Sequence, residues 1–252
     1  MDRLTYRIIK TKKRWRDSTL IRFFLSPQFK NPELSFRRKI QNFKIALKFE
    51  FWWLLIWIGV VIVDVAIAEL LSSKPFIGYI LKDHHGFKGM SHQKLLIAAV
   101  IIAPIFEELA FRGFMNFKRH MIGLSLAAFV SLSLRIFFKA YFPWWSLIVI
   151  ALVVFLIAWL ALKNTVGYEY IRSQKRIIFY TMSILFAIVH LNNFNIEVFS
   201  GFNFLLVPIA VFPQFVASIS LAYIRLKNGL GWSMAFHSFV NLCVVGIYIL
   251  GH

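Results

Sequence analysis

Two adjacent carboxylates and an arginine interrupt an apolar stretch near the middle of the sequence. The stretch reads IIAPIFEELAFRGF and contains Glu107, Glu108 and Arg112. Each ionisable side chain near the centre of a bilayer costs roughly 2.5 to 3.5 kcal/mol. Three of them together must therefore face protein or a water-filled cavity, where pairing or a function offsets the cost.

The spacing of these residues predicts different surroundings for the two carboxylates. On a helix, Glu108 and Arg112 are i and i+4 neighbours that can pair, while Glu107 points about 100° away from Glu108. One carboxylate can then be held ionised while the other stays free. A free carboxylate in a cavity of low dielectric is a competent general base. A buried Glu–Arg ion pair beside a spectator Glu107 is the structural alternative.

Two further apolar stretches carry a histidine at helical spacing from a second residue. FAIVH places Phe186 and His190 four residues apart, and HSFVN does the same for His237 and Asn241. Each pair therefore shares one helical face, although each alone is equally typical of hydrogen bonds between core helices. Brought together, Glu107 and His190 can deprotonate a water molecule. His237 and Asn241 can donate to the oxyanion that forms when this water attacks a peptide carbonyl.

The three motifs, in this order, resemble those of a known protein family. EELAFR fits E-E-x-x-x-R, FAIVH fits F-x-x-x-H and HSFVN fits H-x-x-x-N. They resemble the motifs of the CAAX prenyl protease and bacteriocin-processing (CPBP, or Abi) family of intramembrane endopeptidases. The match covers roughly residues 95–250, and each motif lies in its own apolar run.

The resemblance also implies a role for each motif residue. It implies that Glu107 activates water beside His190 in a hydrophilic cavity between membrane helices. The implied donors to the oxyanion are His237 and Asn241. The other motif residues have supporting roles, and these are Glu108, Arg112 and Phe186.

Other catalytic arrangements fit the sequence less well. It contains no H-E-x-x-H motif of a zinc protease, no G-x-S-x-G nucleophile elbow and no paired intramembrane Asp residues. The single cysteine, Cys243, has no supporting motif. Zinc ligation by Glu107, His190 and His237 stays open, since imidazole and carboxylate are zinc ligands. A single unpaired Glu with His and Asn donors favours a site without metal or other cofactor.

The elements that must position these residues are membrane helices. The chain is 59% hydrophobic with a mean hydropathy of +0.68, more apolar surface than one soluble core can hide. We therefore predict an all-α integral membrane protein, multi-pass, with about seven transmembrane helices around a polar intramembrane cavity. The apolar stretch 75–81 is too short to cross and is predicted to be interfacial or re-entrant. The predicted spans are residues 51–71, 95–114, 121–140, 144–162, 177–191, 204–223 and 230–250.

Basic residues predict the domain organisation and the orientation. The formal net charge is +18, but many Lys and Arg residues precede the first span and most others flank apolar runs. This distribution is typical of a cytoplasmic membrane face and not of nucleic-acid binding. We expect a basic cytoplasmic or interfacial segment over residues 1–50, either lying on anionic lipid or solvated. A multi-pass domain in the plasma membrane follows over 51–252, with its protease-like core at about 95–250 and the N-terminus in the cytoplasm.

Together these features predict an intramembrane endopeptidase. Glutamate-activated water would hydrolyse a peptide bond of a membrane-associated or lipid-modified peptide. The expected partners are membrane lipid and a peptide or membrane-protein substrate. Two other classes stay open: a non-catalytic membrane scaffold or bacteriocin-immunity-type protein, and a proton-coupled transporter whose Glu and His residues relay protons.

Overall fold

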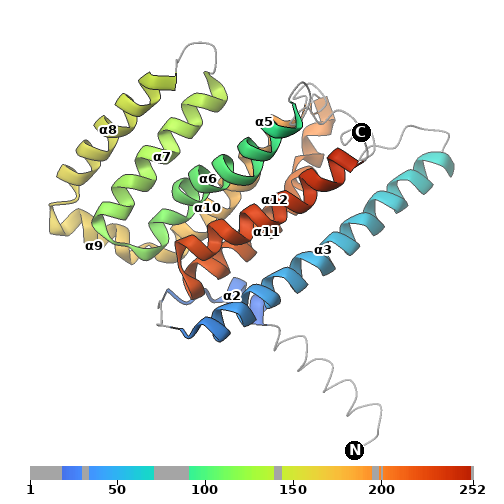
Figure 1. Cartoon of the computed structure of the whole chain (residues 1–252), viewed down its shortest axis with the longest axis horizontal. Coiled ribbons are helices and arrows are strands. Elements are labelled where there is room, and N and C mark those ends of the chain that lie inside the picture. Colours follow the sequence, from blue (N-terminus) through green and yellow to red (C-terminus); the bar gives the residue numbers. More distant parts are fainter. Residues whose placement is uncertain are drawn as a thin grey trace, which may run out of the picture.

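The fold is a bundle of helices. The computed structural model describes residues 19–29, 34–70, 91–138, 144–194, 199 and 201–250, and within these ranges the chain is almost entirely helical and has no strand. Figure 1 shows the long helices running roughly side by side, with α2 and α9 at the same end of the bundle. In chain order the elements are α2 (Thr19–Leu25), α3 (Phe36–Leu70), α5 (His92–Leu96), η1 (Ile97–Ile102), α6 (Ala103–Arg112), η2 (Gly113–Asn116), α7 (Arg119–Phe137), α8 (Trp144–Ala161), α9 (Thr165–Ser173), α10 (Lys175–Val189), η3 (His190–Asn193), η5 (Gly201–Leu206), α11 (Val207–Asn228) and α12 (Leu230–Leu250).

The carboxylates lie on a helix that changes its winding part-way. α5, the π-helical η1 and α6 follow one another without interruption from His92 to Arg112. The helix begins at Ser91, whose side chain accepts a hydrogen bond from the Lys94 N–H. Pro104, at the start of α6, has no backbone N–H, and its ring crowds the carbonyl four residues earlier. The wider π-helical turns of η1 directly before it accommodate this.

The buried core is rich in aromatic rings and is centred on α11. Most of the last turns of α11 are buried, and they pack against α3, α10 and α12. Phe23 of α2 inserts into this core, with ring centroids 5.2 Å from Tyr223 and 5.7 Å from Phe179. Leu20 is also buried there. This part of the N-terminal segment is therefore docked on the bundle through Leu20 and Phe23.

The helices support a multi-pass membrane protein. Within the described ranges, five helices are long and apolar enough to cross a membrane, or six if α8 and α9, bent by 101° at their junction, count as one span. The described residues therefore contain fewer candidate spans than the seven predicted from the sequence. The second predicted span is covered by α5, η1 and α6, a continuous helical stretch from His92 to Arg112 in which no single element is long enough to be counted, and this explains part of the difference. Large apolar side chains cover the outer faces of α3 and α8, as lipid contact requires.

Two sequence predictions concern the flanks of the first span. The predicted boundary between residues 50 and 51 falls inside α3, which begins at Phe36. The apolar stretch 75–81 lies outside the described residues.

Candidate functional site

A large cavity lies between α3, α6, η1, α11 and α12. It has a volume of about 1360 Å³, and most of the side chains in its wall are apolar. The sequence analysis predicted a polar cavity, whereas the polar groups form only a minority of this wall. On α6, η3 and α12 these polar residues are Glu107, His190, Asn193, His237 and Asn241.

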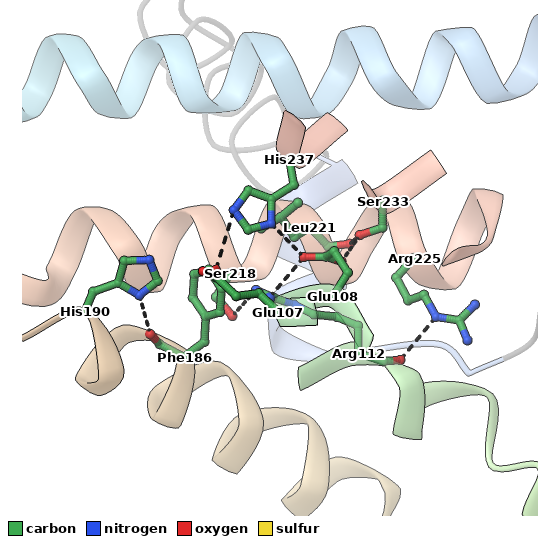
Figure 2. A network of polar contacts seen from close by, with 10 residues as sticks. All are labelled: Glu107, Glu108, Arg112, Phe186, His190, Ser218, Leu221, Arg225, Ser233 and His237. Carbon is green, nitrogen blue, oxygen red and sulfur yellow. Dashed lines mark hydrogen bonds and ion pairs between the residues drawn. The ribbon is translucent and has the colours of Figure 1, made fainter. Parts of the chain in front are cut away.

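Glu108 is the buried anchor of the site. Its Oε1 lies 3.1 Å from Nη1 of Arg112 and 3.2 Å from Nδ1 of His237. The hydroxyl of Ser233 donates to its Oε2. The pairing with Arg112 that the i and i+4 spacing predicts is therefore confirmed. Both oxygens of Glu108 are engaged, so this carboxylate holds helices together (Figure 2).

Arg112 extends this anchor to α10 and α11. Its Nη2 donates to Oγ of Ser218 at 2.9 Å, and its guanidinium lies 3.9 Å from the centroid of the Phe186 ring. The backbone carbonyl of Arg112 accepts a hydrogen bond from Nε of Arg225 at 3.1 Å. Phe186 therefore covers the buried ion pair by a cation–π contact. We call Glu108, Arg112, Ser218, Ser233 and His237 the anchor network.

Glu107 keeps a free carboxylate oxygen beside His237. Its Oε2 is buried and has no hydrogen-bond partner among the described residues. The distance from this oxygen to Nε2 of His237 is 3.7 Å, which is too long for a direct hydrogen bond. The imidazole of His237 thus lies between two carboxylates, with Nδ1 toward Glu108 and Nε2 toward Glu107 (Figure 2). The Glu107 side chain is 19% exposed and lines the cavity, so a water molecule in the cavity can contact this side chain.

His190 follows the last residue of α10 and begins the short 3₁₀ helix η3, so the pattern of backbone hydrogen bonds changes at this residue. Its own N–H bonds to the carbonyls of Ala187 and Ile188, so the carbonyl of Phe186 is left without the usual i+4 donor. Nδ1–H of His190 donates to that carbonyl at 2.7 Å. In the neutral ring this leaves Nε2 as an acceptor. His190 lines the cavity, but no hydrogen bond or ion pair within the described part of the chain joins it to Glu107.

Asn241 is held by a carbonyl that the π-helical turn sets free. The N–H of Ala103 bonds to the carbonyl of Ala98, five residues earlier, and leaves Ala99 without its i+4 donor. The next residue, Pro104, has no N–H to offer. The Ala99 carbonyl instead accepts a hydrogen bond from Nδ2 of Asn241 at 2.8 Å. This contact uses one of the two amide hydrogens of Asn241 and leaves the other.

The structure therefore brings Glu107 and His237 into direct proximity and places His190 and Asn241 on the same cavity. No three His, Cys, Asp or Glu side chains in the described ranges are grouped so that they could hold a metal ion. The set considered for zinc, Glu107 with His190 and His237, does not form such a group.

Sequence reasoning missed the contacts that α11 makes with Arg112. Ser218 and Arg225 are polar residues in an otherwise apolar run, VASISLAYIRLKN, and the cost of burying them in a membrane was the available signal. The sequence does not show which helix they face, because that depends on long-range packing.

No known protein family, curated protein or solved structure matches the chain.

Proposed function

We propose that this chain is an intramembrane endopeptidase in which Glu107 activates a water molecule for attack on a peptide bond. One observation carries the proposal: the Glu107 carboxylate has a buried, unpartnered oxygen in the wall of a large cavity, 3.7 Å from a histidine nitrogen. A general base must lie within hydrogen-bond reach of the water whose proton it takes. The Glu107 carboxylate meets this requirement for a water molecule bound next to it in the cavity.

The proposed reaction follows from the positions of these groups. Water bound at Glu107 gives its proton to the carboxylate while its oxygen attacks the carbonyl carbon of the peptide. The carbonyl oxygen becomes an oxyanion, which accepts a hydrogen bond from the remaining amide hydrogen of Asn241 and, in the form of His237 with a proton on both ring nitrogens, a second one from Nε2–H of His237. The C–N bond then breaks, and Glu107 returns the proton to the leaving amine. His190, through Nε2, helps to orient the water.

The anchor network supports this chemistry by fixing the base and the histidine. Glu108 is the chain neighbour of Glu107 and binds Nδ1 of His237, so one buried carboxylate positions both groups. Preorganised groups of this kind cost little reorganisation during the reaction.

The wall of the cavity supports a membrane-associated or lipid-modified peptide as the substrate. Most of the wall is apolar, including exposed side chains such as Leu54 on α3 and Val244 on α12. An apolar groove of this kind favours hydrocarbon over a polar soluble peptide. We further infer a plasma-membrane location with the N-terminus in the cytoplasm, from the placement of the basic residues.

The test is peptide cleavage by purified protein in detergent, with a panel of lipidated and leader peptides, with and without a chelator. We expect cleavage that survives the chelator and falls by about 10²- to 10⁴-fold in Glu107→Gln, which removes the general base. The variant keeps the size of the side chain, so its elution volume and thermal unfolding should match the wild type. Undiminished cleavage by Glu107→Gln would refute the proposal, and loss of cleavage on chelation would point to a metal.

A non-catalytic scaffold is the second candidate function. Glu108 and Arg112 are completely buried, and their partners lie on α10, α11 and α12, as a purely structural network would require. A scaffold keeps its cellular phenotype in Glu107→Gln, whereas a protease loses it.

A further inference from the structure

A second set of buried acceptor atoms lies in the wall of the same cavity, away from the motif residues. Oε1 of Glu50, on α3, and Oε1 of Gln214, on α11, are shielded from solvent and have no hydrogen-bond partner among the described residues. Both residues line the cavity that contains Glu107 and His237. The hydroxyl of Ser220, which is not part of the cavity wall, lies within interaction range of Glu50, and Oε1 is the oxygen of Glu50 that stays unpartnered.

The packing of α3 on α11 places this second set deep in the bundle. The two helices are antiparallel, since Asn42 Nδ2 donates to Asn228 Oδ1 at 2.8 Å while the Trp53 and Phe212 rings lie 5.3 Å apart. Glu50 is eight residues beyond Asn42 and Ser220 is eight before Asn228, about 12 Å along each helix.

The depth of Ser220 is also that of the anchor network. Its neighbours Ser218 and Leu221 bind Arg112 and Ser233, respectively. The Glu50 carboxylate therefore lies level with the proposed catalytic groups.

The unpartnered atoms determine what kind of group can bind there. A buried carboxylate without a partner costs several kcal/mol. Lys44 and Lys48 line the cavity as well, but no ion pair within the described part of the chain joins either of them to Glu50. The free atoms of Glu50 and Gln214 are both acceptors. The missing partner must therefore be a hydrogen-bond donor, and a cation satisfies the carboxylate best.

We propose that Glu50, together with Gln214, forms a subsite for a primary ammonium group of the substrate. An ammonium carries one positive charge and three N–H donors, so it can pair with the Glu50 carboxylate and donate to the amide oxygen of Gln214 at the same time. A planar guanidinium prefers a bidentate partner and suits this arrangement less. The ammonium comes from a lysine side chain or from a free N-terminus of the peptide. This inference rests on the proposed peptidase function and specifies its substrate class.

The test compares lipopeptides that differ only at one position, lysine or its neutral analogue norleucine, each with a free or an acetylated N-terminus. We expect Glu50→Gln to raise KM about 10- to 100-fold for peptides with an ammonium group and to leave kcat unchanged. The acetylated peptides with norleucine should not respond. The lysine and free-terminus arms show which ammonium is bound.

Control variants separate the subsite from a general effect on the cavity. Lys44→Gln removes a charge from the same wall without touching the subsite and should leave the lysine preference intact. Glu50→Lys should reverse the preference toward peptides with glutamate at that position. If Glu50→Gln does not fold, Gln214→Leu gives the same KM test. Equal KM values in the wild type for all four peptides, with lysine or norleucine and with a free or an acetylated N-terminus, would overturn the subsite.

A binding experiment distinguishes failure of the subsite from failure of the peptidase proposal. The fluorescent lysine and norleucine lipopeptides are titrated into Glu107→Gln protein with and without Glu50→Gln, and anisotropy is measured. Preferential, Glu50-dependent binding of the lysine peptide supports the subsite even if no peptide is cleaved by the wild type. Cleavage without such a preference supports the peptidase and overturns the subsite.

Discussion

Glu107 and Glu108 are neighbours in the chain, yet their environments differ. Glu108 is fully buried and contacts Arg112, Ser233 and His237, whereas Glu107 lines the cavity with one oxygen unpartnered. One helical step of about 100° is enough to separate an anchor from a reactive group. The two carboxylates should therefore respond to the same substitution in different ways.

At the residue scale, we predict that Glu108→Gln destabilises the protein by roughly 3 to 5 kcal/mol, because it leaves the buried Arg112 without its counter-ion. Glu107→Gln should change the free energy of unfolding by well under half of that. Denaturant-induced unfolding in detergent measures both. The control is Glu169→Gln, which removes an exposed ion pair with Arg172 and should cost less than about 1 kcal/mol. Similar losses for Glu107→Gln and Glu108→Gln would contradict the assignment of the anchor.

Two features of the helices position these residues. One is the change from α-helical to π-helical turns before Pro104, and the other is the close packing of α6 against α7 at Gly113. The π-helical turns before Pro104 free the carbonyl that binds Asn241. Gly113 lets α6 and α7 approach so closely that an added Cβ would lie 2.0 Å from Oγ of Ser125. The same Ser125 hydroxyl donates at 2.8 Å to the Leu109 carbonyl, which also accepts the backbone N–H of Gly113, so this contact joins α7 to the last turn of α6.

We predict at the element scale that Pro104→Ala lowers cleavage without destabilising the fold. Alanine restores an N–H and removes the ring that favours the π-helical turn. With regular α-helical winding, the Ala103 N–H bonds to Ala99 and takes the acceptor from Asn241. The expected loss of kcat is about that of Asn241→Leu, of the order of 10-fold or more. Parallel kinetics of both variants, with their thermal unfolding, provide the check, and wild-type kcat in Pro104→Ala would count against this account.

Gly113→Ala should destabilise the protein by roughly 1 to 3 kcal/mol, because the added methyl group clashes with Ser125 and forces α6 and α7 apart. Gly59→Ala is the matched control on α3. Nothing lies within 4 Å of its added Cβ, so this change should be neutral or stabilise the helix by up to about 1 kcal/mol. Thermal unfolding of the two variants gives the comparison, and equal melting temperatures would show that the α6–α7 contact is looser than described.

Local parts of the site were predictable from the sequence, and long-range parts were not. The Glu108–Arg112 pair depends only on i and i+4 spacing, so the sequence predicted it correctly. The contact of His237 with both carboxylates depends on how α12 packs against α6, which no spacing reveals. The number of spans was less predictable, because an apolar run does not show where a helix changes its winding or bends.

At the scale of the whole molecule, the ends of the helices predict sidedness. Ser91 begins the helix that carries Glu107, and Arg172 lies in the exposed α9 near the opposite end of the bundle (Figure 1). With Cys243 replaced by Ala, a cysteine at position 91 should react with an impermeant maleimide from outside intact cells. A cysteine at position 172 should react only after the membrane is opened. The reverse pattern would invert the proposed orientation.

The cavity has a further consequence, which follows from where its wall reaches the surface. Leu54 on α3 and Phe239 and Val244 on α12 belong to the wall of this partly open cavity and are exposed side chains of helices long and apolar enough to cross a membrane. On the proposed function, a lipid-borne peptide can arrive by diffusing within the plane of the bilayer and never has to leave hydrocarbon. Water is then the scarcer reactant in the cavity. The entry of water, more than the binding of the peptide, would limit the rate of turnover.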